Sequence, residues 1–127
     1  MIKILLTWKR NPKLTEEQCE EHYLTVHTEL AKKALKNGPG LRRYVQNKVV
    51  RHTIINYNEC DTPIEAKPDF DRFVELYFDN KESMERAFNT PEIKACFDDH
   101  KNFMETDTPA NLKIYEVVEE IPLERLD

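Results

Sequence analysis

Residues 2–8 read Ile-Lys-Ile-Leu-Leu-Thr-Trp, and this alternation of apolar and other side chains predicts a first strand. The more apolar face of that strand consists of Ile2, Ile4, Leu6 and Trp8. Asn11-Pro12 then breaks the strand. Thr15-Glu16-Glu17-Gln18 follows with the pattern of a capping box, which marks the start of a helix. The first unit is therefore a strand and a capped helix over about 16–36, which ends at Gly38-Pro39-Gly40.

The rest of the chain adds three more strands and a second helix. The polar stretch 56–69 carries two prolines and predicts a loop. The other predicted elements are a strand over 41–51, a strand over 70–78, a helix from Asn80 to Met104 that restarts at Pro91, and a strand over 112–118. The order strand-helix-strand-strand-helix-strand predicts an α+β, ferredoxin-like fold over the whole chain, 1–127. In this fold two helices cover one face of a four-stranded antiparallel sheet.

The second face of the predicted sheet also carries apolar side chains. A sheet face that meets water alternates apolar with polar residues, and helices cover only the other face here. The apolar residues on alternate positions of that second face are Leu5, Phe73, Tyr77, Tyr115 and Val117. A second copy of the chain would bury them, which predicts a homodimer. The alternative is a monomer with a few exposed aromatic side chains.

Composition excludes several classes of function. The chain has 127 residues, which is one domain by length, and a net charge of -5. An acidic chain with interleaved charges has no long-range attraction for nucleic acid or for acidic membranes. The apolar part of the amino-terminal segment is too short to cross a membrane. Three cysteines without a CxxC pair suit reduced thiols, so we expect a cytoplasmic protein.

Several stretches of the sequence resemble the EthD family. They are Lys9-Arg10-Asn11-Pro12, His22-Tyr23-Leu24-Thr25-Val26-His27, Gly38-Pro39-Gly40-Leu41-Arg42-Arg43-Tyr44, Pro91-Glu92 and Phe97-Asp98-Asp99-His100-Lys101-Asn102-Phe103. The resemblance implies a dimeric α/β barrel, related to methylmuconolactone isomerase, tetracenomycin-type polyketide cyclases and cofactor-free quinone-forming monooxygenases. It also implies a cavity between sheet and helices, in which a small cyclic or aromatic substrate exchanges protons without a metal or an organic cofactor.

His27 is the first candidate for catalysis. It follows Tyr23 by four residues and shares a helix flank with it, beside the apolar stripe of that helix. A half-buried imidazole that titrates near neutral pH is a natural general acid–base. The histidine at this position of the family motif is functional in several related barrels, so the resemblance implies the same role for His27. The alternative is a histidine that only packs the helix.

Three further residues are candidates for polarising the substrate or moving a proton. The resemblance implies that Tyr44 lines the pocket, where its phenol would donate a hydrogen bond to a developing enolate. His52 shares a face with Tyr44 if the strand is regular, and the related cyclases carry a histidine in this region. His100 lies one helical turn after Phe97, near the apolar side. The alternatives are a core tyrosine, a solvent-exposed loop histidine and a packing histidine, respectively.

The substrate-binding candidates are cavity-wall residues and one cation: Trp8, Tyr23, Phe103 and Arg43. Arg42 and Arg43 point to opposite faces of a strand, so at most one reaches a cavity, where it would bind a carboxylate; both are surface charges in the alternative interpretation. His22 is expected in solvent. The spacing of five residues between His22 and His27 suits neither i,i+3 nor i,i+4 ligation, and we expect no metal and no cofactor.

These observations favour a cofactor-independent lyase or isomerase that acts by histidine acid–base catalysis. The expected reaction is a decarboxylation, dehydration, cyclisation or lactone isomerisation of a small cyclic, aromatic or polyketide-like molecule. Two alternatives remain open, a cofactor-free monooxygenase of a phenolic substrate and a non-catalytic protein that binds a small molecule, because a fold does not fix a function.

Overall fold

The central element is a four-stranded antiparallel sheet in a computed structural model that describes residues 1–36, 38, 40–58, 60–106 and 112–125. The strands lie in the order β2-β5-β1-β6. Their bounds are β1 Ile2–Trp8, β2 Leu41–Lys48, β5 Arg72–Phe78 and β6 Leu112–Val117. Every neighbouring pair is antiparallel. This topology confirms the ferredoxin-like α+β fold expected from the sequence.

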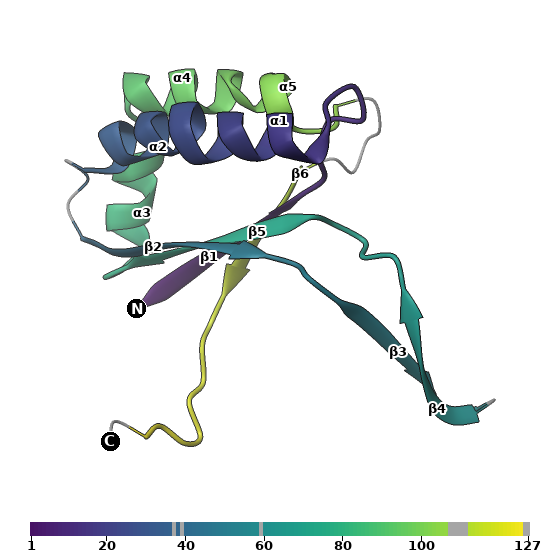
Figure 1. The fold of residues 1–127 in the computed structure, drawn as a ribbon. Coiled ribbons are helices and arrows are strands. Elements are labelled where there is room, and N and C mark those ends of the chain that lie inside the picture. The colour runs from purple at the N-terminus through teal and green to yellow at the C-terminus, as the bar shows by residue number, and fades with distance from the viewer. Residues whose placement is uncertain (37, 39, 59, 107–111, 126–127) are drawn as a thin grey trace.

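Helices cover one face of this sheet (Figure 1). The first helical segment consists of α1 (Glu16–Glu21), a π-helical turn η1 (His22–His27) and α2 (Thr28–Leu35). The second consists of α3 (Lys81–Phe88), α4 (Pro91–Asp98) and α5 (His100–Phe103). The capping box is confirmed, because the Gln18 amide donates to Thr15 Oγ1 at 3.1 Å and the Thr15 amide donates to Gln18 Oε1 at 2.9 Å.

The hydrophobic core lies between the sheet and the helices. Strand residues Ile4, Leu6, Leu76 and Phe78 pack there against helical residues Ala34, Leu35, Ala87 and Ile93. A second cluster surrounds Trp8, whose ring lies 4.9 Å from that of Tyr23 and 5.0 Å from that of Phe103. The alternation predicted for residues 2–8 is therefore confirmed, since Ile4, Leu6 and Trp8 all face the helices.

Residues 52–56 and 60–66 pair as a hairpin where the sequence predicted mostly a loop. Strands β3 (His52–Asn56) and β4 (Cys60–Ala66) pair with Ile54 opposite Ile64 and project away from the main sheet (Figure 1). The prediction was wrong because it gave too much weight to prolines. Pro63 lies within β4, and a two-stranded ribbon has only edge strands, where proline is tolerated. β2 accordingly ends at Lys48 and not near residue 51.

Gly40 shapes the turn between the first helical segment and β2. Its φ angle is +84°, a left-handed conformation that favours glycine. A Cβ atom at this position would lie 2.6 Å from Ser83 Cβ at the start of α3. The glycine therefore permits both the turn and the close approach of α3. Pro39, which also belongs to the predicted helix stop, lies outside the described residues.

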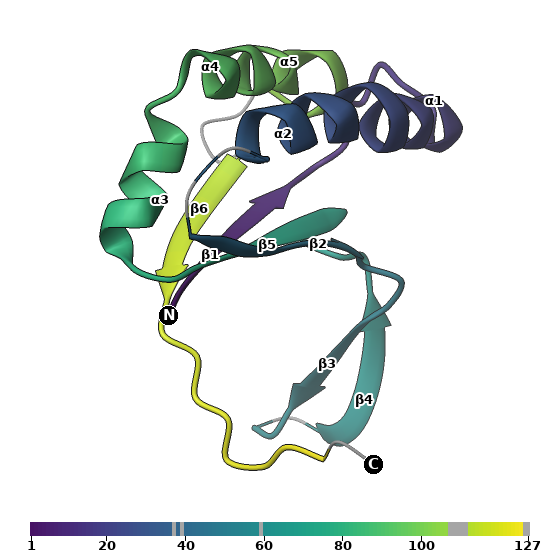
Figure 2. The same cartoon turned by 90° about the vertical axis from the view of Figure 1, so that its left-hand side faces the viewer.

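In the part of the chain that the structure describes, the other face of the sheet carries no helix, and both the β3–β4 hairpin and the segment after β6 lie on this side (Figure 2). Lys3 forms ion pairs there with Glu75 and Glu119. Apolar side chains lie beside this network, including Leu5 and its cross-strand partner Tyr115, which is 46% exposed. The face is thus a mixture of apolar and charged groups. In the described ranges no helix is both long and apolar enough to cross a membrane.

Candidate active site

A small cavity lies between the sheet, the first helical segment and α4–α5. Its volume is about 50 Å³, which is room for a few water-sized groups. Most of its wall is apolar or aromatic, and its polar members are Tyr23, His27, Tyr44, Cys96 and His100. Five of the sequence candidates therefore lie around one space: Trp8, Tyr23, His27, Tyr44 and His100.

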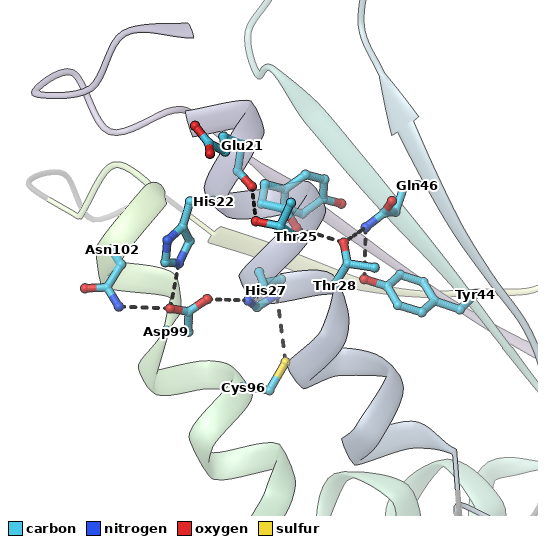
Figure 3. Close-up of polar contacts among 11 residues, drawn as sticks. Glu21, His22, Thr25, His27, Thr28, Tyr44, Gln46, Cys96, Asp99 and Asn102 are labelled. Carbon is cyan, nitrogen blue, oxygen red and sulfur yellow. Dashed lines mark hydrogen bonds and ion pairs between the residues drawn. The ribbon is translucent and has the colours of Figure 1, made fainter. Parts of the chain in front are cut away.

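His27 is buried at the end of the π-turn, with 5% of its surface exposed. Its Nδ1 lies 3.0 Å from Oδ2 of Asp99, a buried carboxylate between α4 and α5 (Figure 3). The other oxygen of Asp99 is held by His22 Nε2 at 2.8 Å and by the Asn102 amide at 2.9 Å. The carboxylate is thus fixed on three sides and orients the His27 ring.

The π-turn explains why two histidines five residues apart reach the same carboxylate. The backbone N–H of Thr28 bonds the carbonyl of Tyr23, five residues earlier, and the Thr28 hydroxyl donates to the same oxygen at 2.8 Å. A wider turn of this kind aligns residues i and i+5, and such turns are frequent at functional sites. His22 therefore bonds Asp99, and its predicted position in solvent was wrong, since the prediction assumed an ordinary α-helix.

The charge states of the pair follow from burial and hydrogen bonding. Burial would raise the pKa of Asp99, but the hydrogen bonds from Asn102, His22 and His27 outweigh it and hold that pKa below its ordinary value. Burial lowers the pKa of His27, and Asp99 offsets only part of the effect. At neutral pH the pair is therefore a carboxylate and a neutral imidazole. Nδ1–H donates to Asp99, and Nε2 keeps its lone pair.

Cys96 and His100 lie next to that lone pair. Cys96 Sγ is 3.8 Å from His27 Nε2, within reach of a weak S–H donation (Figure 3). Burial raises the pKa of this thiol to about 11, so it is protonated at neutral pH. The rings of His27 and His100 lie 5.1 Å apart. Burial, followed by the neighbouring His27, lowers the pKa of His100 to about 4, so His100 is also neutral.

Tyr44 reaches the cavity from β2 and is fixed to the first helical segment. The Gln46 amide donates to the Tyr44 hydroxyl at 3.2 Å and to Thr28 Oγ1 at 2.8 Å. Because the phenol oxygen accepts this bond, its own hydrogen is available for a further acceptor. Burial raises the pKa of Tyr44, so the group is a neutral donor. It fits the role of a hydrogen-bond donor to a developing negative charge.

Two buried polar atoms of the cavity wall have no hydrogen-bond partner within the described part of the chain. They are Trp8 Nε1 and the Tyr23 hydroxyl. An unsatisfied buried polar group costs about 1–3 kcal/mol, so such groups are uncommon. Both residues line the cavity. A polar ligand atom or water in that space would satisfy them.

A larger groove adjoins the cavity on its α3–α4 side. It has a volume of about 910 Å³ and runs between these helices and the edge of the sheet at β6. Phe88, Ile93 and Phe97 line both the groove and the cavity. These three side chains therefore separate a space large enough for a ring compound from the inner space at His27.

Three sequence candidates do not line this cavity. His52 begins β3, where its Nδ1 bonds the Lys67 carbonyl at 2.9 Å, because β2 ends too early for His52 to share a face with Tyr44. Arg43 lies over the Tyr77 ring at 5.1 Å, on the helix-free face. Phe103 is fully buried behind the wall, with its ring 4.5 Å from that of His27. Asp99 and Cys96, by contrast, belong to the site but were not among the candidates.

The fold and the site together define a ferredoxin-like α+β protein with a histidine-bearing cavity between its sheet and its helices. The chain belongs to the EthD family, because the model of the EthD domain matches residues 11–107. No protein with a curated description matches the chain.

Solved structures share this fold. An EthD family protein from Bacillus halodurans is 22% identical, with a TM-score of 0.63 over 94% of this chain and 99% of that one. A dimeric ferredoxin-like protein from Thermobifida fusca is 14% identical, with a TM-score of 0.60 over 93% and 90% of the two chains. A DABB family protein from Mesorhizobium loti is 17% identical, with a TM-score of 0.60 over 94% and 96%. At these identities the likeness shows the fold alone.

Proposed function

We propose that this protein is a lyase or isomerase that uses His27 as its general base on a small cyclic, aromatic or polyketide-like substrate. The observation that carries the proposal is the 3.0 Å contact between His27 Nδ1 and Asp99 Oδ2. It holds a neutral imidazole with its Nε2 lone pair on the cavity side. A general base needs both a free lone pair and a fixed orientation, and the contact with Asp99 fixes the orientation of the His27 ring.

The chemical step is the transfer of a proton from carbon. His27 Nε2 takes the proton from a C–H bond next to a carbonyl, and the electrons of that bond move into the carbonyl oxygen as an enolate. Tyr44 donates a hydrogen bond to this oxygen, and the new imidazolium is stabilised by the Asp99 carboxylate. Return of the proton to another carbon gives an isomerisation. Loss of a leaving group from the enolate gives an elimination.

In this proposal one part of the substrate binds in the groove and another part enters the cavity. The inner space of about 50 Å³ is too small for a ring compound, whereas the adjoining groove of about 910 Å³ accommodates one. We place the ring of the substrate in the groove and its reacting carbon past Phe97, which is 36% exposed. The mainly apolar wall excludes water from the enolate once the substrate is in place.

We also propose that two copies of the chain pair through the helix-free face of the sheet. Leu5 of β1 and its cross-strand partner Tyr115 of β6 lie on that face, and Tyr115 is 46% exposed. A second sheet would bury them. The dimeric state of the Thermobifida fusca relative supports this arrangement.

A substrate screen tests the proposed reaction. Metal-free protein is incubated with cyclic enol lactones, aromatic β-keto acids and hydroxylated polyketide-like ketones, and products are followed by mass spectrometry. We expect turnover without oxygen uptake, and a 10²–10⁴-fold lower kcat/KM in His27→Gln. Glu29→Gln, an exposed change on α2, is the matched control and should keep full activity.

Three outcomes would overturn the proposal. Full activity in His27→Gln would remove the base from the mechanism. Turnover that consumes one molecule of O₂ per product would show that the protein is a monooxygenase and not a lyase or isomerase. Tight binding of a compound with no turnover of any would favour a non-catalytic binding protein.

A further inference from the structure

We infer that His27, Cys96 and His100 form a binding site for Zn²⁺ or a similar transition-metal ion. The spacing of histidines in the first helix gave no indication of this site. One ligand atom from each residue lies within 4.8 Å of the other two. Two imidazole nitrogens and one sulfur are a donor set that Zn²⁺ accepts readily. The inference departs from the expectation of no metal, which considered His22 with His27 and not the residues that the fold brings next to His27.

The spacing of the donor atoms suits a tetrahedral ion. Bonds of about 2.0 Å to nitrogen and about 2.3 Å to sulfur place these two ligands about 3.5 Å apart in a tetrahedral site. The observed distance between His27 Nε2 and Cys96 Sγ is 3.8 Å. Cys96 and His100 are four residues apart across the α4–α5 junction, where the Asp99 backbone stays helical, so both project from one side. Small rotations of side chains complete the site.

Asp99 has the position of the carboxylate that commonly supports a zinc-bound histidine. Such a carboxylate accepts the second ring N–H of the ligand and fixes which nitrogen faces the metal. Asp99 Oδ2 holds His27 Nδ1 in this way, and His22 and Asn102 hold the other oxygen. Binding of Zn²⁺ displaces the thiol proton of Cys96, which is released to solvent. The resulting thiolate and the Asp99 carboxylate together balance the two positive charges of the ion, as burial requires.

The cavity leaves a fourth coordination position. Three protein ligands with an open fourth position are typical of accessible zinc sites, in which water or a small molecule completes the tetrahedron. The space of about 50 Å³ beside the three ligands accommodates an ion and such a molecule. Its size suits an ion better than it suits an organic ring.

Metal binding would also switch off acid–base chemistry at this site. The bound ion takes the Nε2 lone pair that the proposed mechanism needs for proton abstraction. This regulatory consequence rests on the proposed function, but the binding of the metal does not.

Metal titration of the purified, chelator-treated protein tests the inference. Zn²⁺ binding is measured by calorimetry, and Co²⁺ replaces it as a spectroscopic probe, because a cobalt–thiolate bond gives an intense charge-transfer absorption. We expect one ion per chain and a thiolate band. Cys96→Ser should abolish the band, and Cys96→Ser and His100→Gln should each weaken Zn²⁺ binding at least tenfold. Asp99→Asn, a change in a positioning residue, should weaken it about 10–100-fold.

The controls use the same residue types elsewhere in the chain. Cys19→Ser alters a free, buried cysteine outside the cavity wall, and His52→Gln alters the hairpin histidine; neither should change the affinity or the band. Binding that survives both Cys96→Ser and His100→Gln would overturn the inference, as would the absence of a thiolate band in the wild type.

Activity separates this inference from the proposed function. Turnover by metal-free protein that stops when one equivalent of Zn²⁺ binds supports both. Zinc binding at the three ligands in a protein whose turnover is unaffected by His27→Gln leaves the metal site standing and rejects the base. Turnover that depends on His27 without any stoichiometric metal binding rejects the metal site alone.

Discussion

Asp99 and His27 meet through a single contact of 3.0 Å between two buried side chains from different helical segments. The carboxylate cannot rotate freely, because its second oxygen is bonded by His22 and Asn102. His27 is therefore held in one tautomer, with the proton on Nδ1. The contact also joins the π-turn of the first segment to α5, so the geometry of the site depends on how the two segments pack.

The tautomer of His27 is open to direct measurement. In chelator-treated, ¹⁵N-labelled protein at pH 7, we expect long-range ¹H–¹⁵N spectra to show a neutral ring protonated at Nδ1. Asp99→Asn removes the negative charge that selects this form, so the Nε2–H tautomer should become populated. The exposed neighbour Asp98 provides the control, because Asp98→Asn should leave the spectrum of His27 unchanged. A mainly Nε2–H or charged ring in the wild type would contradict the assignment.

The ion pair between Glu20 and Arg72 predicts a pH-dependent contribution to stability. Arg72 Nε and Nη2 donate to the two Glu20 oxygens at 3.0 and 2.5 Å, and the Arg72 side chain is 8% exposed. The hydrogen bond from Arg72 holds the pKa of Glu20 below its ordinary value, against the opposing effect of burial. Glu20→Gln should therefore lower the free energy of unfolding at pH 7 by about 1–3 kcal/mol.

The sign of this effect follows from the lowered pKa. The contribution is fully present above the ordinary pKa of 4.5 and is lost as the pH falls through the lower folded-state pKa. Urea denaturation from pH 7 down to pH 3 should show the difference between wild type and Glu20→Gln shrinking below pH 4.5. Glu17→Gln, an exposed change on the same helix, should have little effect at any pH. A difference that grows on acidification would refute the assignment.

Gly40 offers a test of the packing between the β2 turn and α3. Gly40→Ala forces an L-residue to adopt a φ angle of +84° and places a methyl group against Ser83. We expect a loss of about 2–3 kcal/mol in thermal or urea unfolding. Pairing it with Ser83→Gly removes part of the clash but leaves the backbone strain, so the double variant should regain only part of the stability. A stable Gly40→Ala protein would rule out this backbone description.

If the proposed dimer forms, replacing a residue on the helix-free face should change the mass of the protein particle in solution. Light scattering should give twice the chain mass of 15.1 kDa for the wild type. Tyr115→Lys places a charge opposite Leu5 on β1 and should shift the protein to the monomer. Leu24→Lys changes a comparably exposed apolar residue on the first helical segment and should leave the dimer intact. A wild type that is monomeric at all concentrations would exclude the pairing.

The sequence indicated much of the fold because its signals are local. Alternation in residues 2–8 and the capping box at Thr15 depend on near neighbours, and both are confirmed. The β3–β4 hairpin was missed because Pro63 suggested a loop, although an edge strand tolerates proline.

The site was harder to predict because it depends on long-range packing and on one irregular turn. His27 could be selected from its motif and its place beside the apolar stripe. Its partner Asp99 lies 72 residues away in the chain, and no local pattern links them. The π-turn moved His22 from its expected place in solvent into the cluster. The four-residue spacing of Cys96 and His100 was a local signal for that pair, but His100 was considered alone and Cys96 only as one of three cysteines without a CxxC pair.

Proton exchange from carbon is the most direct test of the claim that His27 is a base. The lactones and keto compounds of the substrate screen are dissolved in D₂O with metal-free protein, and ¹H NMR follows the loss of the C–H signal next to the carbonyl. Wild type should accelerate exchange for at least one compound, and His27→Gln should reduce the rate at least a hundredfold. Equal exchange rates in the two proteins, or no acceleration of any compound by the wild type, would contradict the account.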